Sequence, residues 1–206
     1  MGGCYTPATV LLYDSAVSGN CYKVRQLFAH QGIEYERREV DVIDRSGRLE
    51  LLGALNPALR VPTLVFDDGR SMGESDAIMF YFAEGTPYLL EDRFERAQVL
   101  QWLFFEQYSH EPNIAVARFW VIAGITPSQA DAEAKRRGGI AALRAMESRL
   151  AEREYLVGER YTIADIALYA YTHVAPEAGF ELDAYPGITA WLERVAAQPG
   201  HILITD

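Results

Sequence analysis

The chain has 206 residues, of which 50% are hydrophobic, and it carries a formal net charge of -10 at neutral pH. A chain of this length can bury one large core or two smaller ones. The acidic balance argues against a surface that binds nucleic-acid phosphates, because such surfaces gather Lys and Arg on one face. We therefore expect no nucleic-acid partner.

Cysteine content and hydropathy indicate the compartment. The two cysteines, Cys4 and Cys21, do not indicate a disulfide framework, which fits a reducing environment. The opening MGGCYTPATV lacks a basic region followed by a long apolar run. No later segment approaches the roughly 20 apolar residues that a membrane helix needs. We expect a cytoplasmic protein with no membrane partner. The histidines and cysteines also lack metal-ligand spacing, so we expect no bound metal.

The first segments of the chain alternate between strand and helix. Residues 9–13, TVLLY, form a short apolar run typical of a buried strand. Residues 21–31 carry apolar side chains at helical spacing and end at Gly32, a residue that commonly stops helices. Residues 33–40 indicate a second strand with a charged outer face, and residues 46–54 a short helix.

A hairpin and a helix follow. VPTLVF at residues 61–66 predicts a third strand, and an Asp67-Asp68-Gly69 turn leads to a brief strand at residues 70–72. Residues 75–84 then have a helical pattern. Together these segments predict a parallel β-α-β unit, a helix, and an antiparallel hairpin with a closing helix.

After Gly85-Thr86-Pro87 the strand-like runs disappear and every periodic segment is helical. We therefore expect a first domain over residues 1–84, a linker over 85–90 and an all-helical domain over 91–206. Residues 93–123 predict one long helix, bent near Pro112.

Three more helices are expected in this second half. Residues 128–152 have an amphipathic pattern. Residues 161–171 place Thr162 three residues before Asp165 and continue with an apolar run, which indicates a capping box at the start of a buried helix. The last helix begins at Tyr185-Pro186 and ends before Pro199-Gly200.

The first candidate site is Ser18-Gly19-Asn20-Cys21, where the first strand hands over to the first helix. A helix N-terminus presents unpaired N–H groups and the positive end of the macrodipole. A hydroxyl at this place can donate a hydrogen bond to a bound thiolate and stabilise it. The pKa of the bound thiol then falls below the ordinary value of about 8.5. The alternative is that Ser18 or Asn20 only caps the helix.

Two further segments carry polar or special backbone features. Pro62 cannot donate a ladder hydrogen bond, so it stands at a strand edge or holds a special peptide geometry. If the Val61-Pro62 bond is cis, the Val61 backbone turns outward to pair with an extended peptide ligand; the alternative is an ordinary proline at a strand start. Glu74 and Ser75 open the next helix, where Ser75 can bind a carboxylate and Glu74 an ammonium, or Ser75 can simply cap the helix.

In this order and spacing, the segments around Ser18, Val61-Pro62 and Glu74-Ser75 resemble the glutathione-binding domain of the cytosolic glutathione transferases. YLVGERYTIADIALYAY is similar to the capping-box and hydrophobic-staple segment of that family. SGNCYKVR resembles bacterial members of its serine- or cysteine-type classes. The resemblance covers nearly the whole chain. It implies an α/β plus all-α fold, with an N-terminal thioredoxin-like domain built on a mixed four-stranded sheet and a C-terminal helical bundle.

The resemblance implies a role for residues near the first helix. Ser18 matches the position that hydrogen-bonds the glutathione sulfur. Tyr13 is the rival, because tyrosine-type relatives place their activating phenol at the end of the first strand; we favour Ser18 for its place at the helix N-terminus. Asn20 is a further alternative contact for the thiol. Cys21 takes the second place of a redox-type motif whose first cysteine is replaced, so we expect it to be a packing residue.

The remaining glutathione contacts follow in the same way. The Val61 backbone, next to Pro62, matches the position that pairs with the cysteinyl moiety. Glu74 and Ser75 match the pair that holds the γ-glutamyl end. Arg60 stands where many relatives have lysine, and either cation suits the glycyl carboxylate.

The resemblance also implies a second-substrate pocket between the domains and a homodimer. From the aromatic-rich run at residues 102–120 we name Tyr108 and Arg118 as pocket candidates, although an aromatic stripe on a long helix more often belongs to a core. The expected activity is that of a glutathione transferase, which activates glutathione as a thiolate for addition to a hydrophobic electrophile. The alternatives are a glutathione-dependent isomerase and a non-catalytic binding module on the same fold.

Overall fold

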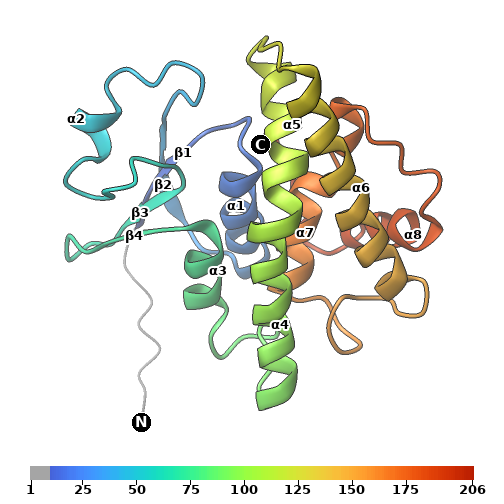
Figure 1. Ribbon diagram of the computed structural model, residues 1–206. Coiled ribbons are helices and arrows are strands. Elements are labelled where there is room, and N and C mark those ends of the chain that lie inside the picture. The colour runs from blue at the N-terminus through green and yellow to red at the C-terminus, as the bar shows by residue number, and fades with distance from the viewer. Residues whose placement is uncertain (1–9) are drawn as a thin grey trace. The chain divides into compact units, whose positions relative to one another are not determined.

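A computed structural model describes residues 10–206, so that Cys4 and Thr9, the expected first residue of the first strand, lie outside the described residues. The chain divides into two compact units (Figure 1). The first runs to Phe82 and takes in Ile202–Asp206, and the second is Ala83–His201.

The first unit is built on a four-stranded sheet. Its strands are β1 (Val10–Asp14), β2 (Tyr35–Glu39), β3 (Thr63–Val65) and β4 (Ser71–Gly73). The spatial order is β2-β1-β3-β4, in which β1 and β2 are parallel while β1 with β3 and β3 with β4 are antiparallel. The predicted mixed sheet is therefore confirmed.

Three helices belong with this sheet: α1 (Gly19–Gln31), α2 (Arg48–Leu52) and α3 (Ser75–Ala83). Helix α1 ends where expected, because Gly32 adopts a left-handed φ of 65° that an L side chain rarely takes. Helix α2 is shorter than the sequence pattern indicated, with 5 residues.

The sheet separates two apolar clusters, as strand alternation requires. Leu12 of β1 and Leu64 of β3 pack with Phe28 of α1 and Ile78 of α3 on one face. Tyr13 packs with the opposite cluster, which contains Leu52 of α2 and Val40. Helices α1 and α3 thus cover one face of the sheet and α2 the other (Figure 1).

The last residues of the chain bind to the first unit through hydrogen bonds that α1 side chains donate to their main-chain carbonyls. The Tyr22 hydroxyl donates to the Ile202 carbonyl at 2.8 Å, and the Arg25 guanidinium donates to the Ile204 carbonyl at 2.7 Å. Arg25 also pairs with the fully buried Asp14 carboxylate at 2.8 Å. These bonds join residues 202–206 to the first unit.

The second unit is helical. Its elements are α4 (Arg93–Phe105), the π-helix η1 (Glu106–His110), α5 (Glu111–Ile122), α6 (Gln129–Leu150), α7 (Ile163–Thr172), the 3-10 helix η2 (Ala175–Ala178) and α8 (Pro186–Ala196). The expected long helix over 93–123 is therefore interrupted by a π-turn before Pro112. Pro112 lies in the first turn of α5, where a missing N–H is tolerated best.

Helix α7 begins with the capping box that the sequence indicated. The Thr162 hydroxyl accepts from the Ala164 amide at 3.3 Å, and the Asp165 carboxylate accepts from the Thr162 amide at 2.9 Å. Every residue of α7 is buried, which makes it the centre of the helical unit. Across residues 10–206, none of the helices combines the length and apolar character needed to cross a membrane.

Candidate functional site

Ser18 is the N-cap residue of α1. Its hydroxyl oxygen accepts a hydrogen bond from the Cys21 amide at 3.3 Å, and its backbone has an extended conformation with φ -84°. The Ser18 amide donates to the Ser15 carbonyl at 3.0 Å, which fixes the loop that joins β1 to α1. A partly buried hydroxyl therefore stands at the positive end of a helix, as the sequence predicted.

The N-terminus of α3 meets the same region. The hydroxyl of Ser75, which is 3% exposed, points to the Asn20 side-chain carbonyl at 3.5 Å. Glu74 precedes it with a left-handed φ of 62°, and its carbonyl accepts the first helical hydrogen bond of α3 from Ile78 at 3.0 Å. The side chain of Glu74 is exposed. The structure thus brings together the two helix starts that carry Ser18 and Glu74-Ser75.

Lys23 and Asp76 also belong to this region, although no motif in the sequence indicated them. The Lys23 ammonium is fully buried and lies 3.2 Å from the Asp76 carboxylate and 3.4 Å from the Ser75 hydroxyl. The sequence indicates only one part of this arrangement, the placement of Asn20 and Lys23 on the same side of α1. Asn20 and Lys23 are three residues apart on α1, a spacing that puts two side chains on one helical face.

The segment before β3 contains a cis peptide bond between Val61 and Pro62. The Asn56 side chain organises this segment, since its amide donates to the Thr63 hydroxyl at 2.9 Å and to the Arg60 carbonyl at 3.2 Å. A Cβ on Gly73 of β4 would lie 2.7 Å from that amide nitrogen. Asn56 therefore joins the Val61 segment to the strand that leads into Glu74, a role that sequence spacing alone did not indicate.

Tyr13 and Cys21 occupy different surroundings from Ser18. The Arg38 guanidinium donates to the Tyr13 hydroxyl at 3.1 Å and covers its ring at 5.3 Å from the centroid. Tyr13 thus lies in the cluster on the α2 face of the sheet. Cys21 is fully buried, and burial, with a smaller contribution from the Asp14 charge, raises the pKa of its thiol far above the ordinary value. The expectation that Cys21 is a packing residue is confirmed.

The two residues named for a second-substrate pocket lie in unlike environments. Tyr108 is in η1 and is 87% exposed. Arg118 is in α5, where it is buried and donates from Nε to the Glu177 carboxylate at 2.7 Å. An exposed phenol can meet a ligand directly, whereas this buried guanidinium is already held by a carboxylate.

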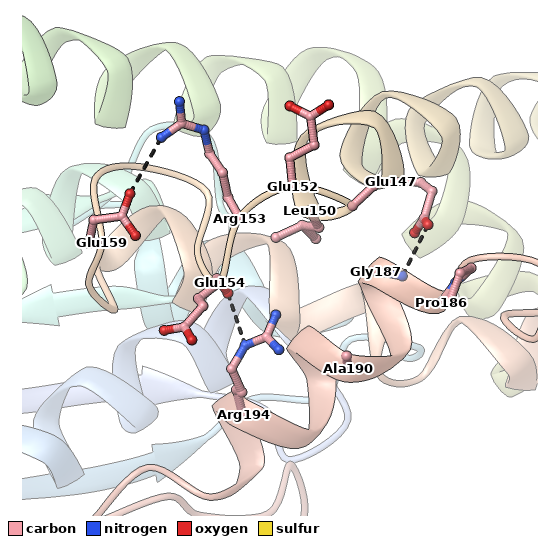
Figure 2. Close-up of a pocket in the computed structure, with 11 residues that line it drawn as sticks. Glu147, Leu150, Glu152, Arg153, Glu154, Glu159, Pro186, Gly187, Ala190 and Arg194 are labelled. Atoms are coloured by element: carbon pink, nitrogen blue, oxygen red, sulfur yellow. Dashed lines mark hydrogen bonds and ion pairs between the residues drawn. The ribbon is translucent and has the colours of Figure 1, made fainter.

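The second unit has a surface depression of about 550 Å³ where α6 ends beside α8 (Figure 2). Polar side chains that line it form hydrogen bonds to main-chain groups of neighbouring segments. The Glu147 carboxylate accepts from the amides of Gly187 and Ile188 at 3.0 and 2.9 Å, and Arg194 donates to the Glu154 carbonyl at 3.1 Å. None of the site residues that the sequence predicted lines this depression. Within the described part of the chain, no cluster of three or more His, Cys, Asp or Glu side chains is arranged to hold a metal ion.

Comparison with known proteins assigns the two halves of the chain. Residues 12–88 match the glutathione S-transferase N-terminal domain, and residues 98–199 match the glutathione S-transferase C-terminal domain. The chain belongs to the glutathione S-transferase family. The expected thioredoxin-like sheet domain and helical domain are those of this family, and the fold prediction is confirmed.

Several relatives span almost the whole chain. Glutathione S-transferase 3 of Zea mays is 30% identical over 93% of this chain and 91% of its own length. Disulfide-bond oxidoreductase YfcG of Escherichia coli is 28% identical over 89% of each chain. The crystal structure of a glutathione S-transferase from Pseudomonas fluorescens superposes with a TM-score of 0.91 at 45% identity, covering 96% of this chain and 99% of that one.

Proposed function

We propose that this chain is a glutathione transferase of the serine type, which binds glutathione in its first unit and activates the thiol through the hydroxyl of Ser18. The observation that carries the proposal is the Ser18 hydroxyl at the N-terminus of α1, in the same unit as the Glu74-Ser75 start of α3. Family membership supports glutathione as the ligand.

Capping a helix and activating a thiol are compatible at Ser18. The oxygen uses one lone pair to accept the Cys21 amide, and its proton can be donated to a ligand at the same time. A hydrogen bond to a charged acceptor stabilises the thiolate more than the thiol, so it lowers the thiol pKa. At neutral pH a thiol of pKa about 8.5 is about 3% ionised, and one of pKa about 6.5 is about 76% ionised.

The second helix start supplies the chemistry for the γ-glutamyl end. Ser75 can donate to its carboxylate, and the exposed Glu74 carboxylate can pair with its ammonium. The Val61 main chain is the proposed partner of the cysteinyl moiety, beside Pro62. Arg60, whose side chain is exposed, is the proposed partner of the glycyl carboxylate.

The sheet geometry supports Ser18 over Tyr13 as the activating group. Tyr13 packs with Val40 and Leu52, and its hydroxyl already accepts a hydrogen bond from Arg38. Ser18 stands at the positive end of α1, where a neighbouring negative charge is stabilised.

The pKa of the bound thiol tests the mechanism. We expect the thiolate absorbance of bound glutathione to titrate at least one pH unit below that of free glutathione. Ser18→Ala should return this pKa toward the free value and lower kcat about 10- to 100-fold, the range for losing a hydrogen bond to a charged group. Glutathione affinity should change little, because most contacts lie elsewhere on the ligand.

A matched control separates activation from helix capping. Ser128 caps α6 in the same manner, accepting from the Asp131 amide at 3.1 Å. Ser128→Ala should therefore lose a comparable capping stability, about 1 kcal/mol, without moving the thiol pKa. A bound thiol with the pKa of free glutathione would refute the mechanism, and an unchanged rate in Ser18→Ala would transfer the role to Tyr13 or Asn20.

Product analysis distinguishes the reactions that this site can support. Conjugation consumes glutathione, an isomerase returns it unchanged, and disulfide chemistry of the kind named for the Escherichia coli relative yields its disulfide. A non-catalytic module would bind glutathione without lowering the thiol pKa. We place conjugation to a hydrophobic electrophile first, since the maize relative carries the transferase name.

We propose further that the protein is a cytoplasmic homodimer. Large apolar side chains that are more than half exposed lie along the α4–α5 segment: Phe94, Phe104 and Val121. Burying such side chains against a second copy is favourable. A molar mass of one chain in light scattering at micromolar concentration would contradict the dimer.

Tyr108 and Arg118 remain our candidates for the second-substrate pocket. The variants Tyr108→Ala and Arg118→Gln test this assignment by whether they change the KM for the electrophile.

A further inference from the structure

The buried ammonium of Lys23 is a feature that thiol activation does not explain. Its side chain has 0% exposure, and the Asp76 carboxylate is 3.2 Å away. Lysine is almost never fully buried unless it is paired, because removing its charge from water is costly. A second contact of the same ammonium leads to the ligand site, since the Ser75 hydroxyl lies 3.4 Å away.

The chemistry of the two groups fixes the direction of the Lys23–Ser75 contact. An ammonium has three donors and no acceptor, so the Ser75 oxygen must accept. The proton of Ser75 is then turned away from Lys23. In this structure it is directed at the Asn20 side-chain carbonyl, at the long distance of 3.5 Å. A carboxylate is a stronger acceptor than an amide carbonyl and would take this proton in a shorter bond.

Asp76 pairs with the Lys23 ammonium and, by neutralising its charge, limits how strongly it can attract a ligand anion. Asp76 follows Ser75 in the first turn of α3, while Lys23 comes from α1, so the ion pair joins the two helix starts. Because the two charges largely cancel, the pair does not act mainly as a long-range attractor of anions. What remains is the direct contact of the ammonium with the Ser75 hydroxyl.

We propose that Lys23 is a positioning residue for glutathione: it orients the Ser75 hydroxyl so that the proton of Ser75 is donated to the α-carboxylate of the γ-glutamyl residue. The inference rests on the proposed glutathione site. It adds that selectivity for this carboxylate depends on a lysine that does not touch the ligand.

The test compares two ligands on several variants by calorimetry. One ligand is glutathione, and the other is γ-aminobutyryl-cysteinylglycine, which keeps the amine and the thiol but lacks the α-carboxylate. The wild-type protein should prefer glutathione. Lys23→Met should weaken glutathione binding about tenfold, the range for a misoriented hydrogen bond to a charged group, and leave the analogue unchanged. Ser75→Ala should do the same, and the double variant should lose no more than either single one.

Control variants distinguish a loss of the positioning role from a general structural effect of the substitution. Lys135→Met makes the same substitution in α6 and should change neither affinity. Since Lys23→Met leaves Asp76 buried without its ammonium, the variant Lys23→Met/Asp76→Asn removes both charges and serves where the single variant does not fold. The pKa of the bound thiol should be unchanged in each folded variant, because the sulfur lies at another part of the ligand.

The outcomes separate the two proposals. Equal losses for both ligands, or additive effects of Lys23→Met and Ser75→Ala, would overturn the positioning role while glutathione binding by the wild type still stands. Absence of glutathione binding to the wild type would overturn both.

Discussion

The buried carboxylate of Asp165 accepts a hydrogen bond from the indole nitrogen of Trp191 at 3.0 Å, which ties the start of α7 to α8. The same carboxylate accepts from the amides of Leu156 and Thr162, at 3.0 and 2.9 Å. Asp165→Ala would leave these buried donors without their acceptor. We expect it to lower the free energy of unfolding by about 3 to 5 kcal/mol, measured by urea unfolding with circular dichroism.

A matched substitution at the surface tests this reasoning. Asp183 is exposed, so Asp183→Ala should change stability by less than about 0.5 kcal/mol. Trp191→Phe keeps most of the packing but removes one donor, and its cost should fall between the two. A similar stability for Asp165→Ala and Asp183→Ala would contradict the view that Asp165 is the polar centre of the helical unit.

Local sequence signals predicted most of the fold. The capping box at Thr162 was predictable because both of its partners lie within one helical turn. The mixed sheet was predictable because strand-sized apolar runs and the Asp67-Asp68-Gly69 turn are local as well. The π-turn at Glu106–His110 was not, since the sequence around it reads as one continuous helix and a wider turn depends on tertiary packing.

The candidate site was predictable only in part, for a related reason. Ser18, Glu74 and Ser75 stand at helix starts, which sequence marks well. The Lys23–Asp76 pair joins residues 53 positions apart, and nothing local says that this lysine is buried. The same holds for residues 202–206, whose attachment to Tyr22 and Arg25 uses main-chain carbonyls that carry no sequence signal.

His173 should make stability depend on pH. Its ring stacks on Tyr169 with centroids 4.5 Å apart, and its Nδ1 donates to the Tyr169 carbonyl at 2.7 Å. Burial lowers the pKa of His173 to about 4, and the nearby Arg118 and His201 charges add to this, while the hydrogen bond to the Tyr169 carbonyl and the Glu177 charge oppose it. The unfolded chain therefore binds a proton that the folded chain does not, between about pH 6.5 and about pH 4.

The sign of the effect follows directly. The contribution of neutral His173 is complete above about pH 6.5 and is lost as pH falls through about 4, so stability should fall by on the order of 2 to 3 kcal/mol across this interval. Urea unfolding at several pH values, for wild type and His173→Gln, measures it as a difference. Burial raises the pKa of Asp165 to about 6, so its protonation in the same pH interval favours the folded state and opposes the effect of His173. Because Asp165 is present in both proteins, its contribution cancels when the two stability profiles are subtracted. Parallel pH profiles for the two proteins would contradict the prediction.

Glu147 caps a helix to which it does not belong. The Tyr185 side chain makes no capping hydrogen bond to α8. The Glu147 carboxylate of α6 instead accepts from the Gly187 amide, as Figure 2 shows, and from the Ile188 amide. Glu147→Ala should cost about 1 to 2 kcal/mol in thermal or urea unfolding, the range for losing a charged cap. Glu152→Ala is the control, because this exposed carboxylate lines the same depression; an equal loss would refute the capping role.

Arg25 should hold the last residues of the chain on the first unit. Its guanidinium lies between the Asp14 carboxylate, at 2.8 Å, and the Ile204 carbonyl, at 2.7 Å. Arg25→Met should lower stability by about 3 to 5 kcal/mol, because it weakens the pairing of a buried carboxylate. Hydrogen exchange of the amides at 202–206 should rise as well, whereas the exposed Arg160→Met control should alter neither. Unchanged exchange in a folded Arg25→Met protein would show that other contacts hold this segment.

Cys21 should be inert although it lies three residues from Ser18. Its side chain has no exposed surface, and burial raises the pKa of its thiol, so the reactive thiolate is scarce in the folded protein. In a Cys4→Ser background, we expect no reaction with an aromatic disulfide reagent at neutral pH and one reacting thiol after unfolding. Glutathione disulfide should likewise leave the mass of the folded protein unchanged. Rapid labelling, or a mixed disulfide between Cys21 and glutathione, would make Cys21 a redox group and would move the chemistry of this site from the Ser18 hydroxyl to a protein thiol.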